Sequence, residues 1–592
     1  MTTQHLHRFP FGAQRGEDGR VTFRLWAPDA PEVALEIEGR SPVPMEGEPE
    51  GWFAVTVPAE PGAQYKYRVK PDLAVPDPAS RFQAGDVHGA SVVVDPRAFS
   101  WKNTAWRGRP WNEAVIYELH PGATGGFAGI TAKLPALKEL GVTVVELMPI
   151  ADFPGRHNWG YDGVLPYAPD SAYGTPDELK TLIDTAHGLG VSVMLDVVYN
   201  HFGPDGNYLH AYAETFFRDD LQTPWGVSID FRKRPVRDYF IGNALYWLME
   251  YRFDGLRFDA VHAISEPDFL DEMARTIRAT VEPGRHVHLV LEHEGNKASH
   301  LAPGLFDAQW TDDWHHCMHV MLTGEHEGYY EDFQDSARQL ARAMAEGFVY
   351  QGEVSPHGGE KRGEPSGHLP PTAFVICLQN HDQIGNRAFG DRLTALARPA
   401  ALRAAATALL MSPNIPMLFM GEEWGTKAPF LFFTDHNEEL AKLVREGRRR
   451  EFQKFAAFSD PARRETIPDP NAASTFDAST PDASEATADG HAAVLSLHRE
   501  LLALRHRYVV PGIPGARSEG AEAIGPKAVV ARWRLGNGAL LTIAVNLDEA
   551  PVPIGPLTGE MLYGSGDHLT RIVPEGALPG DNAVVFITAP GQ

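Results

Sequence analysis

The sequence lacks several features that would assign it to a class at once. Only two of its 592 residues are cysteines, Cys317 and Cys377, which excludes a disulfide framework, and no Cys/His metal spacing includes them. No apolar run reaches the roughly 18 residues needed to cross a bilayer. The N-terminus also lacks the basic segment and apolar segment of a secretion signal. We therefore expect a soluble cytoplasmic protein with no membrane partner.

Positive charge is also scarce. The chain has 53 Lys and Arg against 78 Asp and Glu, which gives a formal net charge of −25. Such a chain repels phosphate backbones, so nucleic acid is excluded as an expected partner. Hydrophobic residues (43%) and charged residues (22%) have the proportions of a globular protein. The length indicates three or four domains, or one large barrel with smaller attachments.

Residues 1–105 contain short runs in which apolar and polar residues alternate, separated by Pro and Gly. A period of two is typical of strands with one buried face. The runs are residues 21–27, 33–37, 52–57 and 65–69. This pattern predicts an immunoglobulin-like β-sandwich over residues 1–105.

From residue 106 to residue 511 the pattern is an apolar strand, a short loop and an amphipathic helix, repeated. The candidate strands are residues 114–120, 142–150, 191–198, 255–260, 286–293, 306–312, 373–382 and 415–424. Several are continuous apolar runs, as parallel strands covered on both faces require. One helix begins with a Thr175–Glu178 capping box, and another is expected over residues 236–251. These elements predict the α/β class, as a (β/α)8 TIM barrel.

The end of the chain returns to strands. Residues 464–490 are rich in Pro, Ser, Thr, Ala and Asp, which predicts a long surface loop within the barrel domain. A helix is expected over residues 498–508. Alternating runs at residues 528–535 and 540–546 then predict a C-terminal β-domain over residues 512–592.

Carboxylates and imidazoles cluster at the predicted carboxyl ends of the barrel strands. In such a barrel these ends face one shared cleft. The segments are residues 158–163, 196–201, 255–262, 292–296, 379–382 and 421–424. Glycoside hydrolysis needs two carboxyl groups, one at the anomeric carbon and one that protonates the departing oxygen. A third negative charge nearby would help to keep the acid protonated.

Four of these segments resemble the signature regions of the α-amylase superfamily. They are Asp196-x-x-x-Asn200-His201, Gly255-x-Arg257-x-Asp259, Glu292 and Asn380-His381-Asp382. Residues 310–316, 322–330, 380–387, 421–425 and 429–436 are similar to the malto-oligosyltrehalose trehalohydrolase family. That family cleaves the α-1,4 bond next to the terminal trehalose of maltooligosyl trehalose and releases trehalose. It works after a partner in the pathway, maltooligosyl trehalose synthase. We expect no cofactor and no metal in this chain.

The resemblance implies a role for each matched residue. Asp259 would be the nucleophile, Glu292 the acid/base and Asp382 a holder of sugar hydroxyls. Glu294 lies two residues beyond Glu292, but the family's Glu-x-x-x-Asn spacing selects Glu292. The mechanism would be retaining, and a retaining pair predicts carboxyl groups roughly 5 to 5.5 Å apart.

Other residues would bind the sugar. His201 and His381 would donate or accept hydrogen bonds, Arg257 would position Asp259, and Tyr161 would stack beneath the ring. Asp196 would organise the rim. Five further candidates have a structural alternative, because they could equally pack in the core, cap a turn or line the strand end. They are His262, Trp225, Trp310, Asp313 and Glu423, and Trp314 shares the ambiguity of the other two tryptophans.

Two departures from the family concern the cleft: the loop after His120, residues 121–126, and the loop at residues 227–231 are both short. Asp205 and Asn207 could suggest a calcium loop, but turns of this composition are commoner, so no metal is expected. Two competing functions stay open. One is a glycogen branching or debranching enzyme that acts on α-1,6 links, and the other is a non-catalytic glucan-binding protein on the same scaffold.

Overall fold

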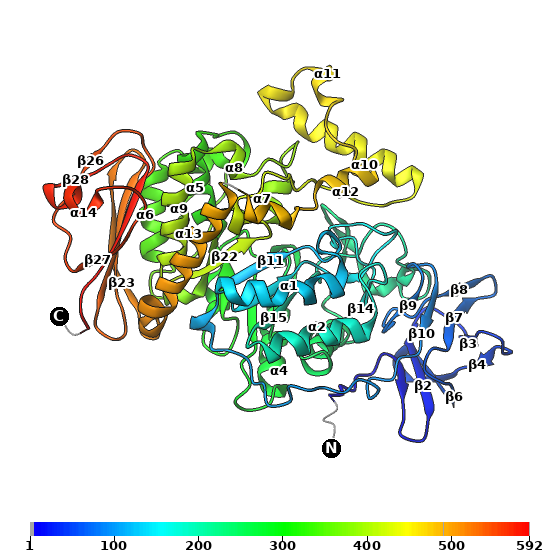
Figure 1. Cartoon of the computed structure of the whole chain (residues 1–592). Helices are drawn as coiled ribbons and strands as arrows, with labels where there is room; N and C mark the ends of the chain where they lie inside the picture. The colour runs from blue at the N-terminus through cyan, green and yellow to red at the C-terminus, as the bar shows by residue number, and fades with distance from the viewer. Residues whose placement is uncertain (1–4, 489, 591–592) are drawn as a thin grey trace.

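The computed structural model describes residues 5–488 and 490–590, which form three successive parts (Figure 1). A set of N-terminal strands lies on one side of a central barrel, and the C-terminal sheet lies on the other. The fold class is thus the predicted one. The limits of 1–105, 106–511 and 512–592 remain our proposal for the domain boundaries.

The N-terminal part is a sandwich of two antiparallel sheets. One has the order β1-β2-β6-β5, and the other has the order β4-β3-β7-β10-β9 with β8 also paired to β7. The strands are β1 (Gly12–Arg15), β2 (Arg20–Trp26), β3 (Ala34–Ile37), β4 (Val43–Pro44), β5 (Glu46–Glu48), β6 (Trp52–Pro58), β7 (Gln64–Lys70), β8 (Leu73–Val75), β9 (Gln83–Ala84) and β10 (Ala90–Val92). Alternation places Val21, Phe23, Tyr65 and Tyr67 in the core. The four predicted strands are confirmed.

Eight parallel strands close the central barrel in the order β11-β12-β15-β18-β19-β20-β21-β22. They are β11 (Ile116–Leu119), β12 (Val144–Leu147), β15 (Ser192–Val197), β18 (Gly255–Phe258), β19 (His288–Leu291), β20 (Ala308–Trp310), β21 (Phe374–Cys377) and β22 (Ile415–Phe419). Ile116 pairs with Met417, so the first and last strands complete the ring. Each lies within one of the eight predicted segments.

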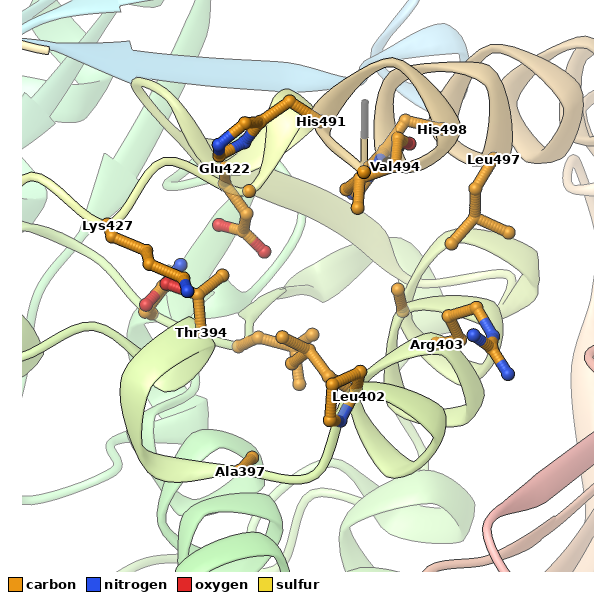
Figure 2. Close-up of a pocket in the computed structure, with 16 residues that line it drawn as sticks. Thr394, Ala397, Leu402, Arg403, Glu422, Lys427, His491, Val494, Leu497 and His498 are labelled. Carbon is orange, nitrogen blue, oxygen red and sulfur yellow. Dashed lines mark hydrogen bonds between the residues drawn. The ribbon is translucent and has the colours of Figure 1, made fainter. Parts of the chain in front are cut away.

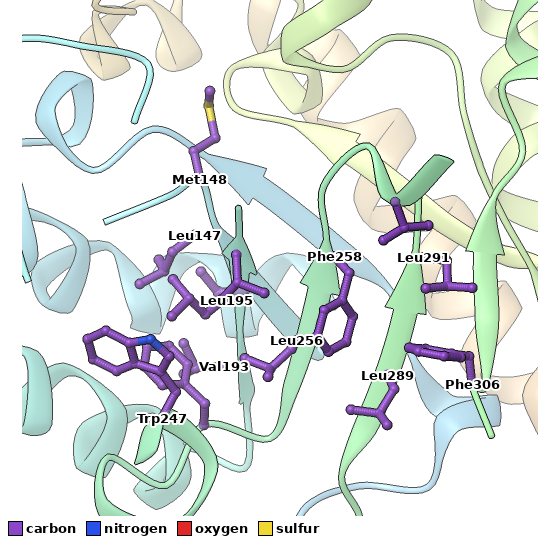
Figure 3. Close-up of a cluster of buried hydrophobic side chains, with 14 of the residues drawn as sticks. Leu147, Met148, Val193, Leu195, Trp247, Leu256, Phe258, Leu289, Leu291 and Phe306 are labelled. Atoms are coloured by element: carbon purple, nitrogen blue, oxygen red, sulfur yellow. The ribbon is translucent and has the colours of Figure 1, made fainter. Parts of the chain in front are cut away.

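The two faces of these strands have different neighbours. Leu195, Leu256 and Leu289 point outward toward the surrounding helices, and Trp247 lies beside Leu195 in this outer layer (Figure 3). The alternate residues point inward, where Met194 and Val290 belong to a small apolar cluster. The barrel interior is therefore a packed layer at this level and not a pore.

Helices surround the barrel. They include α1 (Gly126–Leu140), α2 (Pro176–Gly188), α3 (Arg234–Leu245), α4 (Pro267–Thr280), α5 (Asp312–Thr323), α6 (Ser336–Glu346), α9 (Pro399–Met411) and α13 (His491–Leu504). The Thr175–Glu178 capping box is present at α2. The helix expected over 236–251 is α3 followed by the π-helical turn η6 (Tyr246–Glu250). Among the described residues, no helix is both long and apolar enough to span a membrane.

The prediction of a long surface loop over residues 464–490 is wrong in part. The segment contains α12 (Ala473–Ala478) and the 3-10 helix η14 (Ala483–Thr487). Phe476 packs against Phe433 with ring centroids 5.1 Å apart, and Ser479 Oγ accepts a hydrogen bond from Leu431 N. These contacts order a segment whose composition alone indicates a loop. The next helix, α13, also starts at His491, seven residues before the predicted 498.

The C-terminal part is an antiparallel sheet in the order β23-β24-β25-β29-β27, with a separate β26–β28 pair. The strands are β23 (Arg517–Gly525), β24 (Ala528–Arg534), β25 (Leu540–Asn546), β26 (Val552–Pro553), β27 (Glu560–Gly564), β28 (Ala577–Leu578) and β29 (Asn582–Ile587). The predicted strands at 528–535 and 540–546 are confirmed. One face of the sheet packs on α6 and α9 of the barrel domain, and no residue named as a site candidate lies in it.

Candidate active site

Several charged residues reach the mouth of the barrel because they share the inward register of the strands. Side chains alternate between the two faces of a strand, so the residue two positions after an inward apolar residue also points inward. Glu118 pairs with Glu146 across β11 and β12, Asp196 pairs with Arg257 across β15 and β18, and Glu292 follows β19. The strand pattern alone thus places acids and one cation above the apolar layer.

Arg257 is the centre of this group. Its side chain is fully buried, its Nη1 donates to Asp196 Oδ2 (2.6 Å) and to Asp259 Oδ1 (2.9 Å), and its Nη2 lies 2.8 Å from Glu292 Oε2. The guanidinium also lies over the Trp310 ring, 4.1 Å from the centroid. One cation therefore holds three carboxylates from three strands together.

The backbone after β18 brings the two predicted reacting carboxylates onto adjacent strand ends. Asp259 N donates to Val197 O (3.0 Å), which continues the parallel ladder by one residue. Ala260 then takes a left-handed conformation (φ 39°), and its N–H donates to Glu292 Oε2 (2.8 Å). A non-glycine residue in this region is strained and is found where the surroundings fix it, often at functional sites. The strain at Ala260 thus aims a backbone donor at Glu292.

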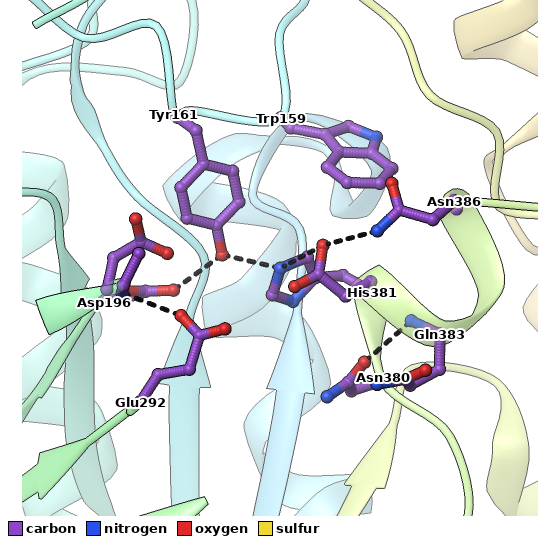
Figure 4. A network of polar contacts seen from close by, with 12 residues as sticks. Trp159, Tyr161, Asp196, Glu292, Asn380, His381, Gln383 and Asn386 are labelled. Carbon is purple, nitrogen blue, oxygen red and sulfur yellow. Dashed lines mark hydrogen bonds and ion pairs between the residues drawn. The ribbon is translucent and has the colours of Figure 1, made fainter. Parts of the chain in front are cut away.

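A second chain of polar contacts starts at Glu118 on β11, and Figure 4 shows its part from His381 through Tyr161 to Asp196. Glu118 Oε1 contacts His381 Nδ1, and His381 N donates to Glu118 Oε2 (3.1 Å). His381 Nε2 lies 2.8 Å from Tyr161 Oη, which donates to Asp196 Oδ2 (2.7 Å). Because Asp196 also accepts from Arg257, the two groups form one continuous network.

Asp382 is the most exposed of the three predicted catalytic carboxylates, with 36% of its side chain accessible. It follows His381 in the short helix α7 (His381–Gly385), which Asn380 caps through its side chain. Its Oδ1 accepts from Asn386 Nδ2 (3.2 Å) and lies 3.6 Å from His381 Nε2. The charges of Glu292 and Asp382 both act on Asp259, so the three carboxylates lie near one another around the barrel mouth.

The electrostatics of the three carboxylates differ. Burial, together with the charges of Glu292 and Asp196, raises the pKa of Asp259 well above its usual range despite Arg257. Burial also raises the pKa of Asp382. For Glu292, burial is outweighed by Arg257 and by the Ala260 N–H, which lower the pKa. The free site therefore has a raised pKa at both aspartates and a lowered pKa at Glu292, and the prediction that a third negative charge helps to keep Glu292 protonated stays untested.

Several predicted binding residues lie around this space. His201 Nε2 lies 3.0 Å from Tyr161 O, and its ring stacks on Trp225 with centroids 5.2 Å apart. Trp225 is 45% exposed at the tip of the hairpin formed by β16 (Phe217–Thr223) and β17 (Gly226–Ile229). His262 is partly exposed and lies 3.7 Å from Glu294 Oε2. The ring of Tyr161 stacks on the ring of His381, with centroids 5.2 Å apart.

Two predicted binding residues lie in other networks. Asp313 accepts hydrogen bonds from Asn296 Nδ2, Val349 N and Arg362 Nη2, and only 1% of it is exposed. Glu423 accepts from Tyr117 Oη (2.8 Å) and Gly421 N (3.1 Å) at the base of its loop. These contacts favour a structural role for both, and their contact with sugar stays an untested prediction. Trp310 and Trp314 are also buried.

Sequence reasoning missed other residues that the structure places at the mouth. Asp312 is partly exposed, and burial and the charges of Glu292 and Asp382 raise its pKa to about 7. From the sequence we predicted its neighbour Asp313 instead, because only the position of α5 decides which of the two turns to the barrel mouth. Glu118 and Glu146 carried a clearer signal, since each is an acid within an apolar strand.

Two other features lie apart from this mouth. Asp205, considered for calcium, contacts His88 (3.2 Å) and accepts from Asn437 Nδ2 (3.1 Å). A cavity of about 310 Å³ lies between α9 and α13, where Leu402, Leu497 and Glu422 line it (Figure 2). Its lining is mainly apolar and includes none of the predicted catalytic carboxylates.

Three family models match the chain in the order of its three parts. They are carbohydrate-binding module 48, the isoamylase N-terminal domain, at residues 10–85, and the alpha-amylase catalytic domain at residues 79–245. A domain of unknown function matches residues 516–586. The catalytic model covers the strands that carry Asp196 and the loop that carries Tyr161, and the sandwich and the C-terminal sheet each have their own match.

Named relatives decide the family. A malto-oligosyltrehalose trehalohydrolase of Deinococcus radiodurans is 42% identical over 512 residues, which are 85% of this chain and 84% of the relative. One of Saccharolobus solfataricus is 41% identical over 457 residues, 74% of this chain and 80% of the relative. The chain belongs to the malto-oligosyltrehalose trehalohydrolase family. A branching enzyme of Pseudoalteromonas atlantica is 32% identical but matches only 45% of this chain.

A solved structure has the same overall fold as this chain. A crystal structure titled a putative alpha amylase from Salmonella typhimurium is 43% identical, with a TM-score of 0.93 over 98% of this chain and 100% of that chain. In this chain, the short loop after His120 forms the 3-10 helix η3 (Gly122–Thr124) and leads directly into α1.

Proposed function

We propose that this protein hydrolyses the α-1,4-glucosidic bond adjoining the terminal trehalose of maltooligosyl trehalose and releases free trehalose. The observation that carries the proposal is the Asp259–Arg257–Glu292 arrangement at the barrel mouth, in a chain of the trehalohydrolase family. Two carboxylates held by one guanidinium on adjacent strand ends are a suitable pair for glycoside hydrolysis.

In the first step, Asp259 attacks the anomeric carbon of the glucose unit on the non-reducing side of the scissile bond. The bond to the O4 of trehalose breaks, Glu292 gives its proton to that oxygen, and trehalose leaves. A covalent ester joins the remaining malto-oligosaccharide to Asp259. In the second step, Glu292 takes a proton from water, the water oxygen attacks the same carbon, and the ester bond to Asp259 breaks. Configuration is retained.

Glu292 must carry a proton before the first step, although its pKa is low in the free site. The contact with Arg257 Nη2 is close (2.8 Å) but is not an aligned hydrogen bond, since that nitrogen makes none to a described residue. Glu292 can therefore turn from Arg257 toward a bound leaving group. The sugar also excludes water from the carboxyl group, which raises its pKa.

The remaining residues are proposed to bind sugar. Asp382, exposed and hydrogen-bonded to Asn386, holds hydroxyl groups of the reacting glucose and favours its distortion toward the transition state. His201 and His381 face the same sugar, and Arg257 positions Asp259. Trp225 offers an exposed ring for a more distant glucose unit. Tyr161 and His262 are also proposed to contact the sugar.

A product assay tests the proposal. The purified protein is incubated with maltooligosyl trehalose and, separately, with a branched α-1,6-linked glucan, and the products are separated by chromatography. Free trehalose with a shortened malto-oligosaccharide supports the proposal. Debranching or new α-1,6 links without trehalose would identify a branching or debranching enzyme, and binding without any product would identify a glucan-binding protein.

The context of the reaction is part of the same proposal. The substrate would come from a maltooligosyl trehalose synthase, which forms the α,α-1,1 link. We also propose a cytoplasmic location, where glucan stores lie. Both cysteines are buried and unpaired, which suits a reducing compartment.

A further inference from the structure

Glu118 is a buried acid that the proposed chemistry does not use. It lies on β11, is 1% exposed, and directs both carboxylate oxygens at one residue, His381. Oε1 contacts the ring at Nδ1 and Oε2 accepts from the backbone N–H (3.1 Å). Glu118 therefore fixes both the ring and the backbone of the residue that precedes Asp382.

The hydrogen-bond inventory determines the protonation of the His381 ring. An ionised carboxylate only accepts, so Nδ1 carries a proton toward Glu118. On the other side, Tyr161 has one hydroxyl proton, which it donates to Asp196 Oδ2, a carboxylate that also accepts from Arg257. Tyr161 Oη must then accept from Nε2 (2.8 Å). Both ring nitrogens carry protons, and His381 is an imidazolium.

The charges around the ring agree with this assignment. The titratable and charged groups that face His381 from the surrounding strands and loops are Glu118, Glu146, Asp196, Glu292, Asp382, Arg257, His120 and Tyr161. Burial lowers the pKa of His381, but the charges of Glu118 and Asp382 outweigh it and raise the pKa to about 9. Removing the charge of Glu118 removes the largest opposing contribution.

We propose that Glu118 is a positioning residue that holds His381 as an imidazolium, with its Nε2–H directed toward Tyr161 and Asp382. The part of the inference that concerns catalysis rests on the proposed function. A fixed cation 3.6 Å from Asp382 keeps a donor on the sugar-facing side and offsets the excess of carboxylates at the mouth. A neutral ring would instead have to break one of its two contacts, or accept a hydrogen bond from the Tyr161 hydroxyl, which would then no longer donate to Asp196.

The first test needs no substrate. The protein is labelled with ¹³C at histidine Cε1, the His381 signal is identified by its loss in His381→Gln, and its chemical shift is followed from pH 5 to 10. The expected midpoint in the wild type is about 9. In Glu118→Gln, which keeps the shape and loses the charge, the midpoint falls by about 1 to 3 pH units. Equal midpoints in the two proteins would overturn the proposal.

The second test is the pH dependence of kcat/KM for trehalose release. His381 is an imidazolium below its pKa, so lowering that pKa moves the alkaline limb of the profile to lower pH. Glu118→Gln should therefore lose activity mainly above pH 7 and regain part of it in more acidic buffer. A uniform loss at every pH would show that Glu118 acts only as part of the packing, and would overturn the catalytic part of the inference.

Two variants serve as controls. Glu146→Gln changes the acid paired in register with Glu118 on β12, whose two carboxylate oxygens have no hydrogen-bond partner among the described residues. This change leaves both contacts between Glu118 and His381 in place, so the titration midpoint of His381 should stay near that of the wild type. Glu118→Asp keeps the charge and should restore most of the midpoint. If Glu118→Gln does not fold, a wild-type midpoint below 6.5 would still overturn the proposal.

The two proposals fail separately. If the wild type releases no trehalose, the proposed function is wrong, while the titration of His381 still decides its protonation. If the wild type releases trehalose and the titration is the same in Glu118→Gln, only the role of Glu118 is wrong.

Discussion

Two buried arginines in this molecule lie in opposite electrostatic settings. Arg81 joins the N-terminal sandwich to the barrel domain by contacting both carboxylate oxygens of Glu250 in η6, each at 3.0 Å. Its guanidinium also lies over the rings of Phe9 and Tyr246. Arg257 is equally buried but faces the carboxylates of Asp196, Asp259 and Glu292.

The difference separates a structural ion pair, Arg81–Glu250, from the cluster of acids around Arg257 in the candidate active site. In the Arg81–Glu250 pair one positive charge meets one negative charge, and little is gained by moving a proton. In the Arg257 cluster the acids outnumber the cation, and Asp196 Oδ1 and Arg257 Nε have no hydrogen-bond partner among the described residues. Such an imbalance lowers stability and perturbs pKa values, and it is typical of active sites. Excess charge, more than burial itself, distinguishes the catalytic region.

The strongest way to break this comparison is to neutralise one acid of the cluster. Asp259→Asn removes the proposed nucleophile, so we expect kcat for trehalose release to fall by about 10⁴-fold. Because the substitution also relieves repulsion among buried carboxylates, the free energy of unfolding should stay equal or rise by about 1 kcal/mol. Chromatographic assays and denaturant unfolding measure the two effects. Near-full hydrolysis by the variant would remove Asp259 from the mechanism.

The balanced pair should respond in the opposite way. Arg81→Leu leaves Glu250 buried without its cation, and we expect the free energy of unfolding to fall by about 3 to 5 kcal/mol. Activity per folded molecule should stay within about twofold, because the site lies on other strands. Glu250→Gln is the matched partner change. A large loss of kcat with unchanged stability would show that the Arg81–Glu250 pair affects the candidate active site directly.

Glu423 is a buried acid outside both the Arg81–Glu250 pair and the Arg257 cluster, and its effect on stability should depend on pH. Burial raises the pKa of Glu423 to about 7 from an ordinary 4.5. The proton is therefore held in the folded state and released in the unfolded state between these values. Stability from this group is complete below about pH 4.5 and is lost as the pH rises through about 7.

Between pH 4.5 and 7 the free energy of unfolding should fall less in Glu423→Gln than in the wild type. The difference between the two proteins should total about 2 to 3 kcal/mol. Trehalose release should stay within about twofold, since Glu423 bonds Tyr117 and Gly421. Thermal melts at pH 5 and 8 give the first quantity. A rise in KM of tenfold or more would support the original prediction that Glu423 binds sugar.

The smallest expected effect concerns the exposed rim. Trp225→Ala removes a ring that stacks on His201 and is 45% exposed. We expect KM to rise about fivefold with kcat nearly unchanged, because one stacking contact contributes about 1 kcal/mol. Trp225→Phe should restore most of the affinity. An unchanged KM for both variants would place Trp225 outside the binding surface.

Local and periodic features of this fold could be predicted from the sequence. The Thr175–Glu178 capping box needs only four residues, and the eight barrel strands follow from apolar runs of the expected length. Because side chains two residues apart in a strand lie on the same face, the sequence also predicts that Arg257 and Asp259 point to the same side. What could not be predicted depends on distant partners: α12 is ordered by Phe476 against Phe433, and Asp312 rather than Asp313 faces the mouth.

The candidate site followed the same division. Asp259, Glu292 and Asp382 could be placed at strand ends from their order along the chain. The partner of His381 could not, because Glu118 lies more than 200 residues earlier and only the closed ring brings the two together. The lowered pKa of Glu292 in the free site could not be predicted, since the sequence does not reveal that the Ala260 N–H and Arg257 both reach its carboxylate.

The pairing of β11 with β22 has a consequence for how the molecule is made. Ile116 finds its neighbour Met417 only after most of the chain has been synthesised, so a growing polypeptide on the ribosome has an open sheet with two unpaired edges. His381 emerges after the seventh strand, β21, but the ring that holds it against Glu118 closes only when the eighth strand, β22, has also emerged. Hydrolytic competence must therefore arrive late and abruptly during translation.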